Sequence, residues 1–365
     1  MTATVAPPAG MVTQVAANPP AIRTRGLRKV YPLPRARRAA AGAGPLAASP
    51  GAQVDGAAPG RATAASATTL DGIVALDSLD LEVGAGEFLG LLGPNGAGKT
   101  TTLGILTTRV RPTAGQAWVG GTDVVRQAVA VRHLIGVVPQ RPNPDRSLSV
   151  RENLIFHAAY FGIPKATAKA RAREVLETFD LADRADSQVE KLSGGQQQRM
   201  MIARALMHDP EVMFLDEPTS GLDPQARLAL WEILRELHAQ GRTIILTTHY
   251  MEEADRLCDR VAFIDRGHLL ALDTPAALKS RAPGGTLIEL TLDGDASVAA
   301  ERVGESGVRV EAQGTILRVW SPRAGEAVAG LIHTAEQAGR QVRDIHLAQP
   351  SLETLFISLT GRKLE

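Results

Sequence analysis

The stretch FLGLLGPNGAGKT at residues 88–100 decides the fold. Its apolar start predicts a buried central strand, and the glycine-rich GPNGAGKT follows directly and leads into a helical pattern. Gly93, Gly96 and Gly98 allow the backbone to turn its N–H groups inward at the positive end of that helix. A glycine-rich turn with no ligand is the alternative interpretation. The strand, the loop, the lysine and the hydroxyl together favour a phosphate-binding loop.

Two side chains at the end of this loop carry its expected chemistry. Lys99 is expected to reach the β and γ phosphates of a nucleoside triphosphate, and the hydroxyl of Thr100 is expected to ligate magnesium. The loop residues predicted to contact the nucleotide are Gly93, Pro94, Asn95, Gly96, Ala97, Gly98, Lys99, Thr100 and Thr101.

A second motif, VMFLDEP at residues 212–218, ends a buried apolar strand with two carboxylates. Ligands of α/β sheets gather at the carboxyl ends of the strands. Because adjacent side chains of a strand point to opposite sides, we expect the two acids to act differently. Asp216 is suited to the magnesium shell, usually through water, and Glu217 to activating the attacking water as general base. An acidic pair that merely ends a strand before a proline is the alternative.

The order of predicted elements gives the fold class. Apolar runs at residues 134–138, 212–215, 243–248 and 261–264 are mostly separated by helical patterns, which predicts an α/β core with a largely parallel sheet. Residues 141–207 become mostly helical and predict a subdomain set into that core. With the two motifs, this pattern predicts a P-loop NTPase.

The remaining segments differ sharply in composition. Residues 1–21 contain four prolines and lack a helical pattern, so we expect a disordered tail. Residues 33–70 collapse to Ala, Gly, Pro, Ser and Arg, which predicts a mobile insertion in a first domain at residues 22–283. Residues 284–365 show the order βαββαβ and then a helix, which predicts a small C-terminal ferredoxin-like α+β domain.

Residues 192–199 read LSGGQQQR, and this string closely resembles the signature of the ABC ATPase family. Ser193 is suited to capping a helix whose first amides, at Gly194 and Gly195, point at a phosphate. A Ser/Gly loop capping an ordinary helix is the alternative, and it explains the serine but not the whole string. The resemblance covers residues 22–267 and implies an ABC ATPase core, with a mixed sheet and a helical subdomain, that binds ATP and Mg²⁺.

The resemblance implies roles for residues elsewhere. Gln140 matches the glutamine that senses the γ-phosphate and magnesium, and SGLD at residues 220–223 matches the loop between paired ATP sites. His249 matches the switch histidine, although a histidine that ends a strand is by itself more often structural. Tyr31 matches the aromatic that stacks on adenine, but the low-complexity insertion begins almost immediately after it. The implied catalytic residues are Glu217, His249 and Gln140, the implied magnesium ligands are Thr100, Gln140 and Asp216, and the implied signature contacts are Ser193, Gly194, Gly195 and Gln196.

The chain has one phosphate loop and one signature, whereas the family sandwiches each ATP between the loop of one core and the signature of another. The resemblance therefore implies a homodimer that ATP closes and hydrolysis opens. The ending PSLETLFISLTGRKLE at residues 350–365, with the βαββαβ domain before it, resembles the daunorubicin-resistance branch, which works with separate ABC-2 type permeases. This branch implies export of a drug-like or lipid-like molecule, powered from the cytoplasmic face of the membrane.

Two rival functions remain open. One is an importer ATPase with a regulatory C-terminal domain, and the other is an ABC ATPase that acts on ribosomes or DNA without a membrane. The formal net charge of +1 over 365 residues gives no reason to expect nucleic acid as the main partner. The sole cysteine, Cys258, excludes an intramolecular disulfide and a multi-cysteine metal site. No stretch approaches the roughly eighteen consecutive apolar residues that would span a bilayer.

Residues 141–162, RPNPDRSLSVRENLIFHAAYFG, lie where members of this family grip their membrane subunit. The segment mixes polar turns with Phe156, Tyr160 and Phe161, which is typical of a docking groove. Burial of these three aromatic side chains in the core is the alternative.

Overall fold

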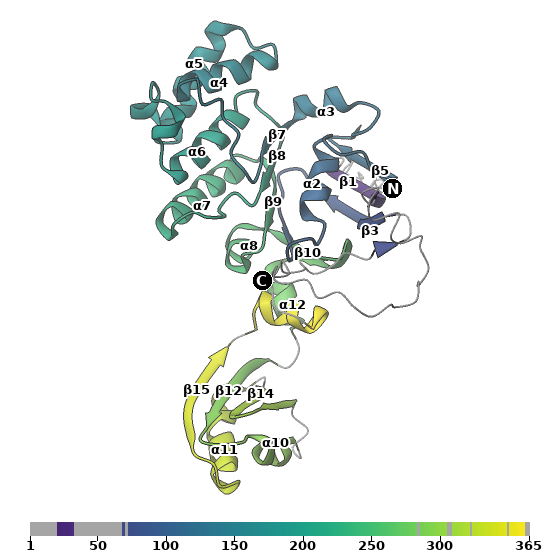
Figure 1. The fold of residues 1–365 in the computed structure, drawn as a ribbon, viewed down its shortest axis with the longest axis vertical. Helices are drawn as coiled ribbons and strands as arrows, with labels where there is room; N and C mark the ends of the chain where they lie inside the picture. The colour runs from purple at the N-terminus through teal and green to yellow at the C-terminus, as the bar shows by residue number, and fades with distance from the viewer. Residues whose placement is uncertain are drawn as a thin grey trace, which may run out of the picture.

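The structure, a computed structural model, describes residues 20–32, 68–69, 72–282, 285–304, 309–321, 323–348 and 350–361. Figure 1 shows a helical lobe beside a body built on two sheets, with a smaller sheet domain below. The tail expected at residues 1–21 and the insertion expected at 33–70 lie almost wholly outside the described residues. The exceptions are Pro20 and Ala21, the second of which is buried and accepts a hydrogen bond from the amide of Gly120, and Thr68–Thr69, which form the short strand β2.

A six-stranded sheet forms the centre of the body. Its strands are β4 (Phe88–Leu92), β7 (Ile135–Val138), β8 (Val212–Asp216), β9 (Thr243–Thr248), β10 (Arg260–Asp265) and β11 (His268–Asp273). The order is β11-β10-β4-β9-β8-β7, and every neighbouring pair is parallel except β10 with β11. The apolar runs of β4, β8 and β9 are buried along their whole length. The predicted α/β fold with a largely parallel sheet is confirmed.

An antiparallel sheet covers one side of the central sheet, in the order β2-β3-β1-β5-β6. Its longer strands are β1 (Ile22–Tyr31), β3 (Gly72–Val83) and β5 (Ala114–Val119). The short strand β6 (Thr122–Asp123) lies at its edge. β3 largely alternates buried residues with more exposed ones, as its sequence predicts. Leu27 and Leu76 of this sheet and Leu89 and Phe214 of the central sheet belong to one buried cluster, which holds the two layers together.

Helices pack around the central sheet and build the lobe beside β7 and β8 (Figure 1). Those around the sheet are α2 (Lys99–Leu106), α3 (Ala128–Leu134), α7 (Pro224–Ala239), α8 (Met251–Leu257) and α9 (Pro275–Ser280). The lobe contains α4 (Val150–Tyr160), α5 (Lys165–Thr178) and α6 (Gly194–Ala205), with short 3-10 turns at Ala182–Arg184 and Val189–Lys191. α4 begins at a capping box between Ser149 and Glu152. Leu154, Leu176 and Met200 are buried in one cluster, so the three helices share a core.

The C-terminal domain is a four-stranded antiparallel sheet with two helices. Its elements are β12 (Thr286–Leu292), α10 (Ser297–Gly304), β13 (Val310–Gln313), β14 (Ile316–Ser321), α11 (Ala324–Gln337) and β15 (Val342–Ala348). The strand order β13-β14-β12-β15 is that of a ferredoxin-like fold, as predicted. Ile288, Leu290 and Val319 are buried with Ala299 and Leu331 of the helices, so this domain has a hydrophobic core of its own.

The last helix, α12 (Leu352–Thr360), returns to the body formed by the two larger sheets. Leu352, Leu355 and Phe356 are buried in the same cluster as residues of α8 and α9. The ring of Phe356 meets that of Phe263 edge to face, with 5.7 Å between centroids. The sequence predicts this helix only as the end of the C-terminal segment, and its packing fastens that segment to the body (Figure 1).

Candidate functional site

The loop between β4 and α2 has the backbone geometry of an anion site. A Cβ added at Gly93 would come within 2.1 Å of the carbonyl oxygen of Ile264, so the loop can lie this close to β10 only with glycine. Gly98 has a φ of 111°, and its Cβ would meet the carbonyl oxygen of Ala75 at 2.6 Å. No side chain caps the amino end of α2, which leaves its first amides for a ligand.

Lys99 lies buried against this loop, with 4% of its side chain exposed. Its ammonium donates hydrogen bonds to the carbonyl oxygens of Gly93 and Pro94 and lies 3.5 Å from Oε1 of Glu217. Burial lowers the pKa of Lys99, and the charge of Glu217 opposes that effect. The ion pair therefore keeps a cation directly behind the phosphate loop.

Asp216 and Glu217 both contact groups at the phosphate loop, but they have different partners. Oδ1 of Asp216 accepts hydrogen bonds from the hydroxyls of Thr100, at 3.2 Å, and Thr247, at 2.6 Å. Glu217 follows the strand with a φ of 46°, in the left-handed region that residues other than glycine rarely adopt. Its amide donates to the hydroxyl of Thr247 at 3.0 Å. This bend, rather than strand alternation, turns the carboxylate of Glu217 toward Lys99.

The carboxylate of Glu217 is the meeting point of the expected catalytic residues. Oε2 accepts a hydrogen bond from Nε2 of Gln140 at 3.0 Å and lies 3.3 Å from Nδ1 of His249, in a close contact that is not aligned as a hydrogen bond. The contact with His249, followed by the charge of Lys99, lowers the pKa of Glu217, while burial opposes this. Glu217 is therefore ionised at neutral pH, as a general base must be.

The residues expected to hold magnesium fit that ion in part. The hydroxyl of Thr100 and the carboxylate of Asp216 are hard oxygen donors that already lie side by side. Gln140 lines the cavity beside the phosphate loop, but its side-chain amide donates a hydrogen bond to Glu217. Within the described residues there is no cluster of three or more His, Cys, Asp or Glu that could hold a metal alone. Magnesium in nucleotide sites needs only one or two protein ligands, because phosphates and water supply the rest.

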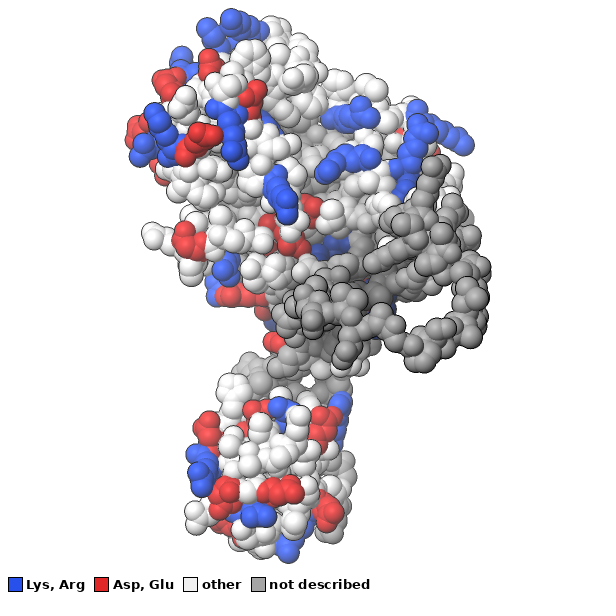
Figure 2. Space-filling model, in the orientation of Figure 1, with Lys and Arg blue, Asp and Glu red and all other residues white. Residues whose placement is uncertain are grey.

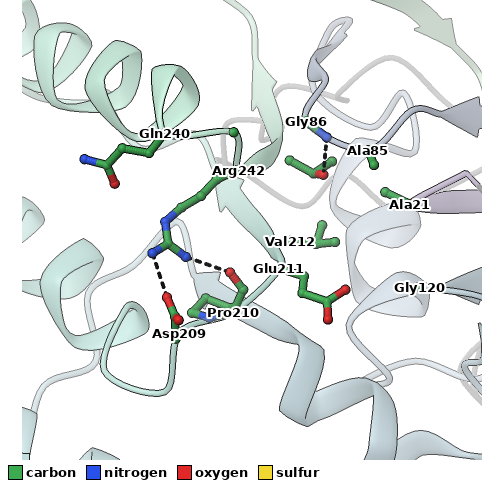
Figure 3. A pocket seen from close by; sticks show the side chains of 12 residues that line it. Ala21, Ala85, Gly86, Gly120, Asp209, Pro210, Glu211, Val212, Gln240 and Arg242 are labelled. Atoms are coloured by element: carbon green, nitrogen blue, oxygen red, sulfur yellow. Dashed lines mark hydrogen bonds and ion pairs between the residues drawn. The ribbon is translucent and has the colours of Figure 1, made fainter. Parts of the chain in front are cut away.

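Two cavities lie at opposite edges of the central sheet. One of about 210 Å³ is lined by the phosphate loop together with Ala75, Gln140 and Glu217. The other, of about 550 Å³, lies where β8 and β9 begin (Figure 3). There the guanidinium of Arg242 is held by the carboxylate of Asp209 and a backbone carbonyl, so its donors point away from the open space. Because α/β sheets bind ligands at the carboxyl ends of their strands, the smaller cavity is the candidate site.

The signature residues form a second helix start away from that cavity. Ser193 caps α6 by accepting from the amide of Gln196 at 3.3 Å, and the side chain of Gln196 accepts from the amide of Ser193 at 3.0 Å. Ser193 and Gly194 are exposed, whereas a Cβ on Gly195 would approach that of Ala226 to 2.9 Å. The residues that line the phosphate-loop cavity in the described chain include none of these.

The two remaining family positions lie at the ends of elements. Tyr31 ends β1 with 37% of its surface exposed, and the ammonium of Lys29 lies 4.9 Å from the centre of its ring. Asp223, the last residue of SGLD, caps α7 by accepting from the amide of Ala226 at 2.9 Å. The structure thus joins Lys99, Gln140, Asp216, Glu217 and His249 around one loop, while Tyr31 and the signature remain apart from it.

Sequence reasoning missed Thr247, which is fully buried and holds both acids. The available signal was a hydroxyl in the apolar run TIILTT, where a buried polar group must find a partner. Thr247 lies 31 residues from Asp216, so no local spacing links the two.

Comparison with known proteins identifies the family of the chain. Residues 76–220 match the ABC transporter family. The daunorubicin resistance ATP-binding protein DrrA3 of Streptomyces coeruleorubidus is 42% identical over 289 residues, which cover 79% of this chain and 91% of that protein. The Nod factor export ATP-binding protein I of Paraburkholderia xenovorans is 42% identical over 290 residues, which cover 80% and 93%.

Solved structures share the fold. CbiO1 of Clostridium perfringens, part of the ABC transporter complex cbiONQ, aligns with a TM-score of 0.57 at 24% identity, over 72% of this chain and 92% of that one. A dimeric ATP-binding cassette bound to ADP and Pi aligns with a TM-score of 0.56 at 24% identity, over 69% of this chain and 98% of that one. Within the described residues, no helix combines the length and apolar character needed to cross a bilayer. The chain belongs to the ABC transporter family, as an ATP-binding subunit that couples ATP hydrolysis to transport.

Proposed function

We propose that this subunit works as a homodimer at the cytoplasmic face of the membrane and drives a separate ABC-2 type permease that exports a drug-like or lipid-like molecule. The observation that carries the proposal is the contrast between a phosphate loop ringed by charged partners and a signature helix whose start is exposed. Relatives named for daunorubicin resistance and for Nod factor export support the direction and the class of cargo.

The proposed chemistry begins with an exchange of partners around Glu217. When ATP binds, Lys99 moves from Glu217 to the β and γ phosphates, and the free amides of α2 face the same anion. Glu217 then accepts a proton from the attacking water, which His249 holds in place. Thr100 and Asp216, with Gln140, would hold Mg²⁺, which neutralises charge on the phosphates.

The second anion site requires another protomer. The amides at the start of α6 are lined by Ser193, Gly194 and Gly195, with Gln196 fixed behind them by the capping box. These groups are suited to the γ-phosphate held by a neighbouring phosphate loop, since a helix start favours negative charge. Adenine would stack on Tyr31, whose ring is partly exposed at the end of β1.

The proposed permease site is the groove of about 470 Å³ beside α4. Phe156 and Tyr160 line it with 54% and 88% of their surfaces exposed, which favours docking for these two. Phe161 instead is only partly exposed and stacks on the ring of His208, with 3.7 Å between centroids, so it is less available for docking. On the face that Figure 2 shows, basic and acidic side chains are interspersed over the helical lobe and the C-terminal domain.

An importer is the competing function within transport, and a role without a membrane is the one that the family assignment disfavours. The ferredoxin-like C-terminal sheet favours export over the importer. Co-purification from membranes with a polytopic partner, followed by ATP-dependent efflux in vesicles, would support the transporter. A chain that sediments with ribosomes or DNA instead would contradict it.

Glu217→Gln tests the dimer directly. Glutamine keeps the shape of the side chain but cannot accept the proton, so we expect ATP to bind, turnover to be abolished and a stable dimer to accumulate. Size-exclusion chromatography with light scattering should show dimer with ATP and monomer without it. The double variant with Lys99→Ala is the matched control and should stay monomeric. Monomers alone with ATP at saturating concentration would refute the sandwich.

A further inference from the structure

Glu253 is a fully buried carboxyl outside the set of residues described so far. It lies on α8, four residues after His249, and its Oε1 accepts a hydrogen bond of 3.0 Å from Nε1 of Trp231 on α7. Arg227, also on α7, acts on it through charge rather than through a direct bond. A buried acid with so few partners is costly unless it has a structural task.

Two threonine hydroxyls lie beside the carboxyl of Glu253. Among the described residues, neither Oε2 of Glu253 nor the hydroxyl of Thr219 has an aligned hydrogen-bond partner, and both are buried. The hydroxyls of Thr248 and Thr219 are nonetheless close enough to favour the charged carboxylate. Burial is the stronger effect and raises the pKa of Glu253. The carboxyl of Glu253 thus lies beside one hydroxyl of each of two loops, in addition to its bond from Trp231.

Glu253 lies between two loops, one that follows Glu217 and one that carries His249. Thr219 follows Glu217 by two residues and begins the turn that contains SGLD, whereas Thr248 directly precedes His249. Thr248 also accepts a hydrogen bond of 2.9 Å from the amide of Tyr250, which shapes the loop that carries the histidine. The carboxyl therefore lies where the chain leaving Glu217 meets the chain leaving His249.

We propose that Glu253 is a positioning residue, whose buried carboxyl holds the loop of His249 against the turn at Thr219 and so maintains the approach of His249 to Glu217. The inference rests on the proposed roles of those two residues in hydrolysis. Trp231 anchors one oxygen of the carboxyl, and the hydroxyls of Thr219 and Thr248, one from each loop, lie beside the group. Glu253 is not among the residues that line the phosphate-loop cavity, so its loss should act on the rate of the chemical step rather than on ATP binding.

The test compares Glu253→Gln with Glu253→Ala in the full-length chain. The glutamine side chain keeps an acceptor for Trp231 and a polar group beside the two threonine hydroxyls, so we expect kcat to stay within about threefold of the parent. Alanine removes both contacts, and we expect kcat to fall about tenfold to a hundredfold because small misplacements of catalytic groups are that costly. KM for ATP should change by less than about threefold in both variants.

Trp231→Phe provides an independent route, because it removes the donor and keeps an aromatic ring. We expect Trp231→Phe to lower kcat, as Glu253→Ala does. The double variant with both substitutions should have a kcat no lower than that of the slower single variant. If Glu253→Ala does not fold, this variant and Glu253→Gln still decide the question.

The outcomes separate this inference from the function on which it rests. Unchanged kcat per folded molecule in Glu253→Ala or Trp231→Phe would overturn the positioning role, and so would additive losses in the double variant. A Glu253→Gln variant as slow as the alanine variant would also overturn it. Glu217→Gln is the reference in the same assay: if it still hydrolyses ATP, the proposed catalytic assignment fails whatever Glu253 does.

Discussion

The phosphate loop and the signature loop each present the start of a helix to an anion, but only the phosphate loop adds charged side chains. Both place glycines before or at the start of a helix, where unpaired amides and the helix dipole favour an anion. At the phosphate loop, Lys99, Gln140 and His249 converge on Glu217 within the same chain. At the signature, the capping box between Ser193 and Gln196 satisfies the backbone and adds no charge.

This difference has a physical consequence for function. A helix start alone contributes a modest electrostatic attraction, about 0.3–1 kcal/mol for an exposed charge, so the signature cannot hold a nucleotide unaided. The phosphate loop adds a buried cation and two acids that organise it. ATP should therefore bind first to the phosphate loop, and the weaker signature should then act as a sensor that engages only when the γ-phosphate is present.

The largest expected effect comes from breaking the stronger site. Lys99→Ala removes charge-assisted contacts to two phosphates, each worth on the order of 1.5–3 kcal/mol, so ATP affinity should fall by at least about a hundredfold. Titration with a fluorescent ATP analogue measures this loss. Lys99→Arg keeps the charge and should lose less. An unchanged dissociation constant in Lys99→Ala would show that the loop does not depend on its cation.

Local sequence patterns were sufficient for most of the stronger site. The strand, the glycines, Lys99 and the acidic pair are each encoded within a few residues, so periodicity and motif spacing predict them. His249 and Gln140 needed the family resemblance, because their contact with Glu217 joins segments far apart in the chain. The ferredoxin-like order was also readable from alternating strands and helices.

Long-range packing explains what was missed. Thr247 lies 31 residues from Asp216, and Glu253 lies 22 residues from Trp231. Periodicity describes which face of an element is buried, not which distant group it meets. The left-handed backbone at Glu217 was hidden for the same reason, because strand alternation was extended one residue past the true end of β8. The return of α12 to the body depends on Phe263, almost a hundred residues earlier in the chain.

Lowering the pH should destabilise the helical lobe, which carries the signature, before it destabilises the phosphate-loop site. This effect should be smaller than that of Lys99→Ala. Burial, followed by the charges of Arg204 and His208, lowers the pKa of His157 to about 4, well below its ordinary value of 6.5. The unfolded chain takes up this proton as the pH falls below about 6.5, whereas the folded chain does so only near 4. The stabilisation is thus complete above pH 6.5 and is lost as the pH falls toward 4, at a cost of on the order of 2–3 kcal/mol.

His157 lies in the lobe that carries the signature helix, so mild acid should loosen that side first. The pKa of Glu217 is lowered instead, and its stabilising effect is lost only at more acidic pH, as the pH falls through the folded pKa. Urea unfolding at several pH values checks the prediction, with His157→Gln as the variant that cannot titrate. Equal loss of stability in the parent and this variant between about pH 6.5 and about pH 4.5 would contradict it.

The smallest effect distinguishes the two signature glycines. A Cβ on Gly194 has open space, meeting only Leu222 at 3.9 Å, so Gly194→Ala should leave stability equal or raise it by up to about 1 kcal/mol through helix propensity. A Cβ on Gly195 meets that of Ala226 at 2.9 Å, so Gly195→Ala should lower stability by about 1 kcal/mol as overpacking offsets the propensity gain.

Activity should follow a different order from stability. The methyl group on Gly194 lies at the open side proposed to meet a neighbouring γ-phosphate, and the methyl group on Gly195 pushes the start of α6 away from Ala226. ATPase turnover should therefore fall in both variants while ATP binding to the phosphate loop is kept. Urea midpoints and turnover measured on the same preparations separate the two roles. If Gly194→Ala hydrolysed ATP at the parental rate, the open side of the signature would be unused, and a helix start would have to be regarded as packing alone.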